Sequence, residues 1–399
     1  MNPQNILIVE SHLNPSGGGV QRVSYIIGEA LRSRKFGVYY AYCTKNTDTT
    51  LIAEDYKFLI DPTATEADLY EQFKSIIDGH DIKTIIVQNG HIPILNTIYT
   101  RLKQNLQLKI IYCLHSYPDI YANKNSIRLI SLHLYLKNIV RWLYHKLKES
   151  KSTKEIKRAY NISDSYVLLS KRYIPLFQKL YKIKDPSKLH AINNPASFDE
   201  YDSKCLNKKE KILLTVSRME ENHKRISLIL KIWKEINEEF PEWQLYMVGD
   251  GPDLECYKKR VKKWGLKRIS FIGHSDNVEK YYERAGIFLM TSISEGLPMT
   301  VIEAQTFGCV PVVFDNFESI HDIIDGKNGV IVKSNDLKSY IKELKNLMRC
   351  EDKRMRLAQN GMISSQTNFS KERIIDEWLE LLPHSKKACN QAQTLRWIP

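Results

Sequence analysis

Short apolar runs alternate with longer amphipathic stretches along the first 195 residues. The runs are rich in β-branched and aromatic side chains, whereas stretches such as 20–31 and 67–77 place apolar residues at helical spacing. This alternation predicts a parallel sheet with helices on both faces. Its strands are expected at 6–9, 38–42, 84–87, 109–114 and 166–169.

A second series of the same kind follows a break near Asn193 to Pro195. The polar stretch 196–210 is interpreted as a linker. Strands are expected beyond it at 212–216, 244–248, 269–272, 287–290, 310–314 and 329–332, and helices at 225–240, 254–264, 278–284, 298–307 and 371–382. The class is therefore α/β, with two Rossmann-like, doubly wound domains that face each other across a cleft.

The predicted boundaries follow the linker. They are a first domain over 1–196, a second domain over 197–382, and a tail over 383–399 that packs back toward the first domain. Doubly wound sheets bind ligands at the carboxyl ends of their strands. The cleft between the two sheets is therefore where a ligand is expected.

Composition and cysteine usage indicate an intracellular folded protein. The 399 residues exceed what one core usually supports, and no segment reaches the roughly 18 uninterrupted apolar residues that a membrane span needs. The first apolar run is short and has no basic flank, which favours a buried strand over a signal peptide. Seven scattered cysteines without a C-x-x-C pair argue against disulfides and a zinc site. We expect a cytoplasmic protein.

Positive charge is concentrated in one part of the chain. The formal net charge is +13, and 82–160 holds 14 Lys and Arg against 3 Asp and Glu. Such an excess indicates phosphate groups or an anionic lipid surface as a partner, although a basic surface that only confers solubility is the plainer alternative.

Within this part, 125–148 has the pattern of an amphipathic helix. Its basic face carries His133, Lys137, Arg141, His145 and Lys148, and its apolar face carries Leu132, Tyr135, Leu136, Ile139, Trp142 and Leu143. The helix either lies on an anionic membrane or packs its apolar face into the first domain. We expect the basic region 124–158 to hold the protein on the inner face of the plasma membrane.

The most informative stretch is EGLPMTVIE, from Glu295 to Glu303. Pro298 suits a first helical turn and Gly308 the position just past the helix end. Backbone amides at the start of this helix, near Met299, Thr300 and Val301, would be free to attract phosphate. Both carboxylates can accept hydrogen bonds from sugar hydroxyls. A capping Glu followed by a solvated helix Glu is the alternative.

Two cations follow the first strand of the second domain. Arg218 and Lys224 suit the negative charge that a departing diphosphate develops. Arg225 competes with Lys224 for this role, and both cations could also be ordinary surface residues.

The first domain offers a glycine-rich turn and a histidine. Gly18 and Gly19 would let the backbone approach a ligand, unless the turn is only a flexible loop. His115 directly follows the strand 109–114, where parallel sheets bind ligands, although a lone histidine is often structural. His12 and His91 also follow strands and are weaker candidates.

The E-x7-E segment resembles the signature of retaining glycosyltransferases of the GT-B fold, family 4 (group 1). The resemblance extends through GGGVQR, TVSRM with its following lysine, VGDGPD, FIGHSDNV and DIIDGKNGVIV. It implies transfer of a hexose or N-acetylhexosamine from a nucleotide-diphosphate sugar to a lipid-linked saccharide in bacterial surface polysaccharide synthesis. A UDP-sugar is expected, with GDP-mannose or GDP-fucose left open.

The resemblance also implies roles for individual residues. Glu295 would hold the transferred sugar and Glu303 the ribose, while Arg218 and Lys224 would hold the diphosphate. His115 would contact the transferred sugar or its phosphate. Further donor-binding positions are Gly18, Gly19, Gly296, Leu297, Met299, Thr300 and Val301.

No Asp-x-Asp metal motif occurs in a usable context, so we expect no metal and no other cofactor. Two alternative functions stay open at this stage. One is a sugar-nucleotide epimerase or a phosphorylase on the same fold. The other is a nucleic-acid-binding protein that uses the basic region and leaves the cleft motif unexplained.

Overall fold

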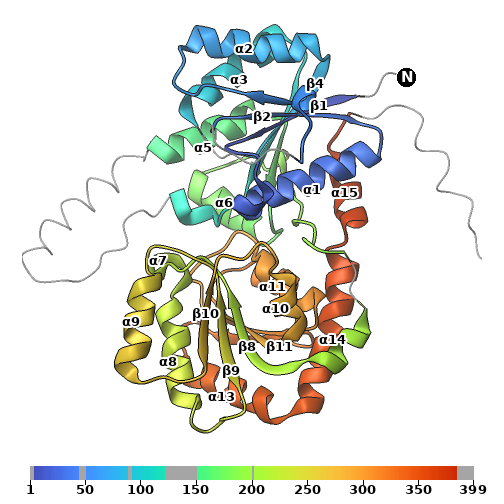
Figure 1. The fold of residues 1–399 in the computed structure, drawn as a ribbon. Coiled ribbons are helices and arrows are strands. Elements are labelled where there is room, and N and C mark those ends of the chain that lie inside the picture. The colour runs from blue at the N-terminus through green and yellow to red at the C-terminus, as the bar shows by residue number, and fades with distance from the viewer. Residues whose placement is uncertain (1–3, 45–50, 89–91, 122–150, 200–201, 384–399) are drawn as a thin grey trace, which may run out of the picture.

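The computed structural model describes residues 4–44, 51–88, 92–121, 151–199 and 202–383. Figure 1 shows two lobes, one above the other, each built around a sheet with helices on both of its sides. The amphipathic segment 125–148 lies outside the described residues. Among those described, no helix is long and apolar enough to cross a bilayer.

The first lobe contains a seven-stranded, all-parallel sheet. Its strand order is β3-β2-β1-β4-β5-β6-β7, so β1 lies in the middle and Ile6 pairs with Val38 on one side and Thr84 on the other. The strands are β1 (Asn5–Glu10), β2 (Gly37–Tyr42), β3 (Lys57–Leu59), β4 (Ile82–Val87), β5 (Lys109–Leu114), β6 (Ser165–Leu168) and β7 (Leu189–Ala191). The five predicted strands are present. The three-residue strands β3 and β7 lie at the two edges of the sheet and are too short for a periodic signal.

Helices cover both faces of this sheet because their apolar residues recur at helical spacing. One face carries α2 (Glu66–Gly79), α3 (Pro93–Asn105), α5 (Lys151–Ile162) and α6 (Tyr173–Tyr181). In α2, Leu69, Phe73 and Ile76 turn inward, and the Thr65 side chain accepts the amide of Asp68 at the helix start. The opposite face carries α1 (Gly19–Ser33).

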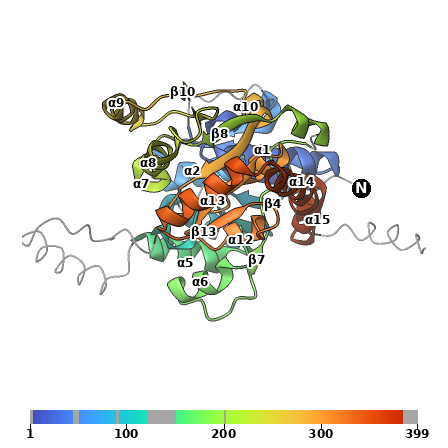
Figure 2. The same cartoon turned by 90° about the horizontal axis from the view of Figure 1, so that it is seen from below.

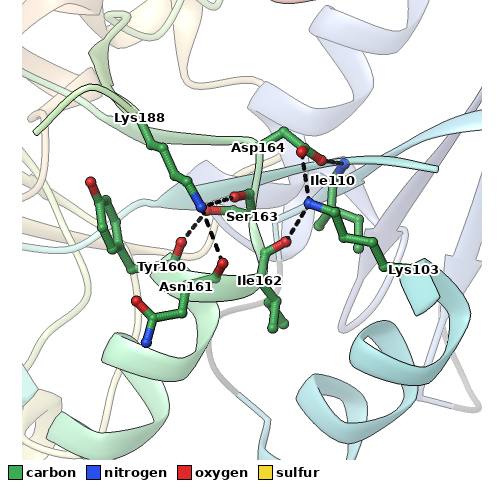
Figure 3. A network of polar contacts seen from close by, with 8 residues as sticks. All are labelled: Lys103, Ile110, Tyr160, Asn161, Ile162, Ser163, Asp164 and Lys188. Atoms are coloured by element: carbon green, nitrogen blue, oxygen red, sulfur yellow. Dashed lines mark hydrogen bonds and ion pairs between the residues drawn. The ribbon is translucent and has the colours of Figure 1, made fainter. Parts of the chain in front are cut away.

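Polar contacts anchor the turn between α5 and β6 (Figure 3). The Lys103 ammonium donates to the Ile162 carbonyl (2.8 Å) and to the Asp164 carboxylate (2.6 Å), which also accepts the Ile110 amide (2.8 Å). Lys188 donates to the carbonyls of Asn161 and Ser163. Lysines thus satisfy carbonyls at the helix end, and β5, β6 and β7 are held in register.

The second lobe contains a six-stranded, all-parallel sheet of order β10-β9-β8-β11-β12-β13. Its strands are β8 (Glu210–Val216), β9 (Gln244–Val248), β10 (Ile269–Gly273), β11 (Ala285–Met290), β12 (Val310–Asp315) and β13 (Val330–Lys333). Its helices are α7 (Glu221–Lys224), α8 (Ile226–Ile236), α9 (Leu254–Trp264), α10 (Glu279–Arg284), α11 (Met299–Thr306), α12 (Ile320–Ile323), α13 (Leu337–Arg349) and α14 (Glu351–Asn368). The predicted strands and helices of this domain are all present.

The last described helix corrects the predicted domain boundary. The sequence places 371–382 in the second domain, but α15 (Lys371–Glu380) packs on α1, and Ile374, Ile375 and Trp378 join the core of the first lobe. Figures 1 and 2 both show α15 beside α1. The helical pattern predicts an apolar face without saying which sheet covers it. The tail beyond residue 383 lies outside the described residues.

Candidate active site

The E-x7-E motif follows the central strand β11, and the residues that lead into it are tied to the end of α7. The Ile293 amide donates to the His223 carbonyl (2.8 Å), and the Thr291 hydroxyl donates to the Lys224 carbonyl (2.9 Å). These bonds fix two segments that lie about 70 residues apart in sequence against each other. The motif loop and Lys224, one of the two predicted diphosphate cations, therefore meet at the carboxyl edge of the second sheet.

Lys224 and Glu295 form an ion pair in this edge. Their Nζ and Oε1 atoms lie 2.5 Å apart, and the side chains are 28% and 17% exposed. The neighbouring Arg225 has a left-handed backbone (φ 52°), donates to Asn335 Oδ1 (2.8 Å) and lies over the Phe314 ring. Of the two adjacent cations, Lys224 is the one that contacts the motif.

Arg218 lies just beyond the carboxyl end of β8. Its side chain is 68% exposed and its Nε lies 3.8 Å from Glu220 Oε2. The backbone beneath it is held by the VGDGPD turn, where a Cβ on Gly249 (φ +126°) would come within 2.0 Å of the Ser217 carbonyl oxygen. This close approach requires glycine there. The structure records no contact of Arg218 with Lys224 or Glu295.

The helix α11 begins one residue later than predicted, at Met299, with Pro298 as its cap. The Val301 amide donates to the Pro298 carbonyl (3.0 Å), so the prediction that it is free to bind phosphate is wrong. Met299 and Thr300 occupy the first two helical positions, where an amide has no carbonyl one turn earlier to bind. Gly308 (φ +70°) ends the helix, with its amide and that of Cys309 bonded to the carbonyls of Gln305 and Ala304.

The side chains of Leu297 and Val301 are buried in the core of the second domain. Either residue can therefore reach a ligand only through its backbone.

Glu303 lies in a buried polar network and is 5% exposed. Its carboxylate accepts the hydroxyls of Tyr282 (2.9 Å) and Ser197 (2.7 Å) and lies 3.5 Å from Arg22 Nη1. Arg22 comes from α1, so this ion pair joins the two domains. The predicted ribose contact would share the carboxylate with these partners.

The glycine turn of the first domain is tightly packed. A Cβ on Gly17 would come within 2.6 Å of the His12 ring, and one on Gly18 within 2.7 Å of Gln21 Oε1, whereas Gly19 has open space. Gly18 caps α1 and Gly19 is its first residue. His12 therefore supports the turn.

His115 lies at the end of β5 and faces the motif of the other domain. Its Nε2 is hydrogen-bonded to Gln88 Oε1, and burial lowers its pKa from 6.5 to about 4. The ring is therefore neutral near pH 7. A Cβ on Gly296 would come within 2.1 Å of the His115 carbonyl oxygen, so the EGLP turn packs directly on this strand end.

Sequence reasoning missed several residues at this junction. The Tyr173 hydroxyl donates to the Glu295 carbonyl oxygen at 2.8 Å. The same hydroxyl lies 2.8 Å from Ser319 Oγ. Arg22 belongs to the GGGVQR segment and Gln88 follows a predicted strand, so both had a signal that was overlooked. Nothing in the sequence around Tyr173 indicates its position.

The described residues contain no group of three or more His, Cys, Asp or Glu side chains arranged to hold a metal ion. His91 lies outside the described residues.

Known proteins share this fold. A family model described as glycosyl transferases group 1 matches 198–363. An uncharacterized glycosyltransferase of Haemophilus influenzae is 24% identical over 375 residues, which cover 92% of this chain and 97% of that protein. A Campylobacter jejuni α-1,4-N-acetyl-D-galactosaminyltransferase, named for an undecaprenol-diphosphate-linked acceptor, is 27% identical over 213 residues, 53% of this chain and 58% of that protein.

Solved structures extend the likeness to the first domain. Anabaena HepE in complex with UDP superposes with a TM-score of 0.72 at 13% identity, covering 94% of this chain and 98% of that one. The pneumococcal O-GlcNAc transferase GtfA, in complex with UDP and GlcNAc, superposes with a TM-score of 0.71 at 12% identity. This superposition covers 95% of this chain and 98% of that one. The two facing doubly wound domains are thus the GT-B fold. Residues 198–363 thus match the group 1 glycosyltransferases, and the chain is a glycosyltransferase of the GT-B fold.

Proposed function

We propose that this enzyme is a retaining glycosyltransferase that moves a hexose or N-acetylhexosamine from a UDP-sugar to a lipid-linked saccharide. The observation that carries the proposal is the Lys224–Glu295 ion pair, at the edge of the second sheet, opposite the neutral His115. A cation and a carboxylate side by side suit a ligand in which a diphosphate adjoins sugar hydroxyls.

The substrate classes rest on the relatives. HepE and GtfA were solved with UDP, and two relatives are named for undecaprenol-diphosphate-linked acceptors, including an Escherichia coli α-1,3-galactosyltransferase that uses UDP-Gal. The same kinds of donor and acceptor fit the arrangement here. The role in surface polysaccharide synthesis is proposed on the same basis.

The residues divide the chemistry between them. Lys224, the exposed Arg218 and the start of α11 would stabilise the charge that develops on the departing diphosphate. Glu295 would orient the sugar. Neither of the two motif carboxylates is reserved as a nucleophile, because Glu295 is paired with Lys224 and Glu303 with its own network. The proposal therefore includes a front-face mechanism in which the departing phosphate oxygen accepts the proton of the acceptor hydroxyl.

Membrane contact through 124–158 is part of the proposal. Only 151–158 is described, in α5, where Ile156 is buried and Lys151 and Lys154 are exposed. In this part the apolar side packs inward, and Lys151 and Lys154 face solvent, where they would be able to contact anionic lipid.

The test is a thermal-shift screen against UDP- and GDP-sugars, followed by turnover of the stabilising donor with and without a lipid-linked acceptor. We expect stabilisation by a UDP-sugar, acceptor-dependent release of UDP, an α-linked product, and no loss of rate in EDTA. Conversion of donor without acceptor would instead indicate the epimerase. Binding of RNA without any sugar nucleotide would contradict the proposal.

A further inference from the structure

Three buried polar atoms at the edge of the first sheet have no hydrogen-bond partner among the described residues. They are Gln88 Nε2, His115 Nδ1 and Ser116 Oγ. The Gln88 residue is only 2% exposed. Buried polar groups are nearly always paired, because leaving one unpaired destabilises the folded state. Three together indicate a polar ligand that supplies the missing partners.

The three atoms lie at the point where the two domains meet. Gln88 follows β4, its amide donates to the Val9 carbonyl (2.9 Å), and His115 and Ser116 follow the adjacent strand β5. The backbone of His115 and Ser116 lies against Gly296, next to Glu295. A ligand that reaches these atoms is therefore also within reach of the proposed sugar-binding carboxylate.

The Gln88–His115 bond determines what the ring can offer. If the side-chain oxygen of Gln88 accepts Nε2–H, the neutral imidazole has its lone pair on Nδ1. Gln88 Nε2 is then a donor, His115 Nδ1 an acceptor, and the Ser116 hydroxyl both. This set matches sugar hydroxyls, which also donate and accept. It does not match a phosphate oxygen, which would face a lone pair at Nδ1.

We propose that Gln88 is a positioning residue that holds His115 in the Nε2–H tautomer, and that Gln88, His115 and Ser116 together bind saccharide hydroxyls rather than phosphate. This deepens the proposed function and rests on it. The lowered pKa of His115 is consistent with a ring that stays neutral at the pH of the cell.

The first test reads the tautomer directly and needs no turnover. Two-bond ¹H–¹⁵N spectra of protein labelled in its histidine rings, with His115 assigned by the His115→Asn variant, should show Nε2 protonated and Nδ1 free at pH 7. Gln88→Leu should shift His115 toward the Nδ1–H form. Gln88→Glu, which keeps an acceptor oxygen, should not. A wild-type Nδ1–H ring, or an unchanged tautomer in Gln88→Leu, would overturn the positioning role.

The second test assigns the ligand. Ser116→Ala and Gln88→Glu each remove a donor, and each should raise the KM for the saccharide roughly tenfold while UDP alone binds unchanged. Separate titrations of donor sugar and acceptor saccharide show which one binds. Ser163→Ala, which removes a buried hydroxyl away from the cleft, is the matched control and should leave KM unchanged.

Weaker binding of UDP in Ser116→Ala, which adds no charge, would show that the cluster holds phosphate and would contradict the hydroxyl assignment. The tautomer of His115 is measured without substrate, so this test gives a result even if no sugar nucleotide binds. A failure of the positioning role of Gln88 can therefore be told apart from a failure of the proposed function.

Discussion

The carboxyl edges of the two sheets are built from the same kind of strand end but differ in chemistry. The edge of the second domain is charged and internally paired, with Lys224 on Glu295 and Glu303 held by Tyr282 and Ser197. The edge of the first domain is neutral, with Gln88, His115 and Ser116 offering buried atoms that lack partners.

This difference indicates a division of labour. Charges in a partly buried edge need a counter-charge while they wait for a ligand, because an unpaired buried charge is costly. Neutral groups can stay unpaired at lower cost. A diphosphate suits the first kind of edge and sugar hydroxyls suit the second. The family model covers 198–363, which holds the charged edge only.

The largest effect is expected from removing the charged edge. Glu295→Ala should lower kcat by about 10²- to 10³-fold, because the sugar loses an orienting carboxylate and Lys224 loses its partner. Turnover of the donor measures this. The matched control is Glu239→Ala, which breaks a surface ion pair with Lys345 and should leave kcat unchanged. Full activity of a folded Glu295→Ala protein would refute the site.

Moving the edge of the second sheet away from the edge of the first sheet should lower turnover by the next largest factor. Gly296→Ala places a methyl group within 2.1 Å of the His115 carbonyl oxygen, so the EGLP turn must move away. A displacement of about 1 Å can lower turnover by about 10²-fold. The control is Gly79→Ala at the end of α2, where no atom lies within 4 Å of the added carbon. Equal kinetics for the two variants would show that the contact between the edges is dispensable.

The placement of α15 can be tested through stability. Trp378→Ala should destabilise the protein by about 3–5 kcal/mol, because the buried indole belongs to the core of the first domain. Hydrogen exchange followed by mass spectrometry should show faster exchange in β1 and α1 and little change in β8. If hydrogen exchange became faster in β8 before it did in β1 and α1, α15 would belong to the second domain, as the sequence predicted.

The smallest effect concerns a carboxylate next to the neutral edge. Burial raises the pKa of Glu10 from 4.5 to about 7, although Ser24 and Ser11 donate to it. The folded state therefore binds a proton more tightly, and stability is lost as the pH rises from about 4.5 through 7.

Glu10→Gln, which stays neutral, should be more stable than the wild type by about 2–3 kcal/mol at pH 8. The gain should shrink toward pH 5. Urea unfolding at both pH values measures it, and a gain that does not depend on pH would exclude titration of Glu10 as its cause.

Most of the fold could be predicted because each element depends on a local pattern. Strand β11 is a continuous apolar run and α9 has the predicted bounds, since periodicity, capping residues and turn residues act within a few positions. The candidate site was found for the same reason, because Glu295 and Glu303 lie on one short segment. Gln88 and His115 lie 27 residues apart in the sequence, so no local pattern indicates that they pair.

By itself the sequence determined two doubly wound domains, the E-x7-E turn and helix, and the residue types that a glycosyltransferase needs. Only the tertiary structure decided that Lys224 rather than Arg225 contacts Glu295, that Arg22 reaches Glu303 across the cleft, and that α15 closes the core of the first domain. The reason is physical. Hydrophobic periodicity sets which face of an element is buried, whereas the partner of that face depends on how distant segments are brought together in space.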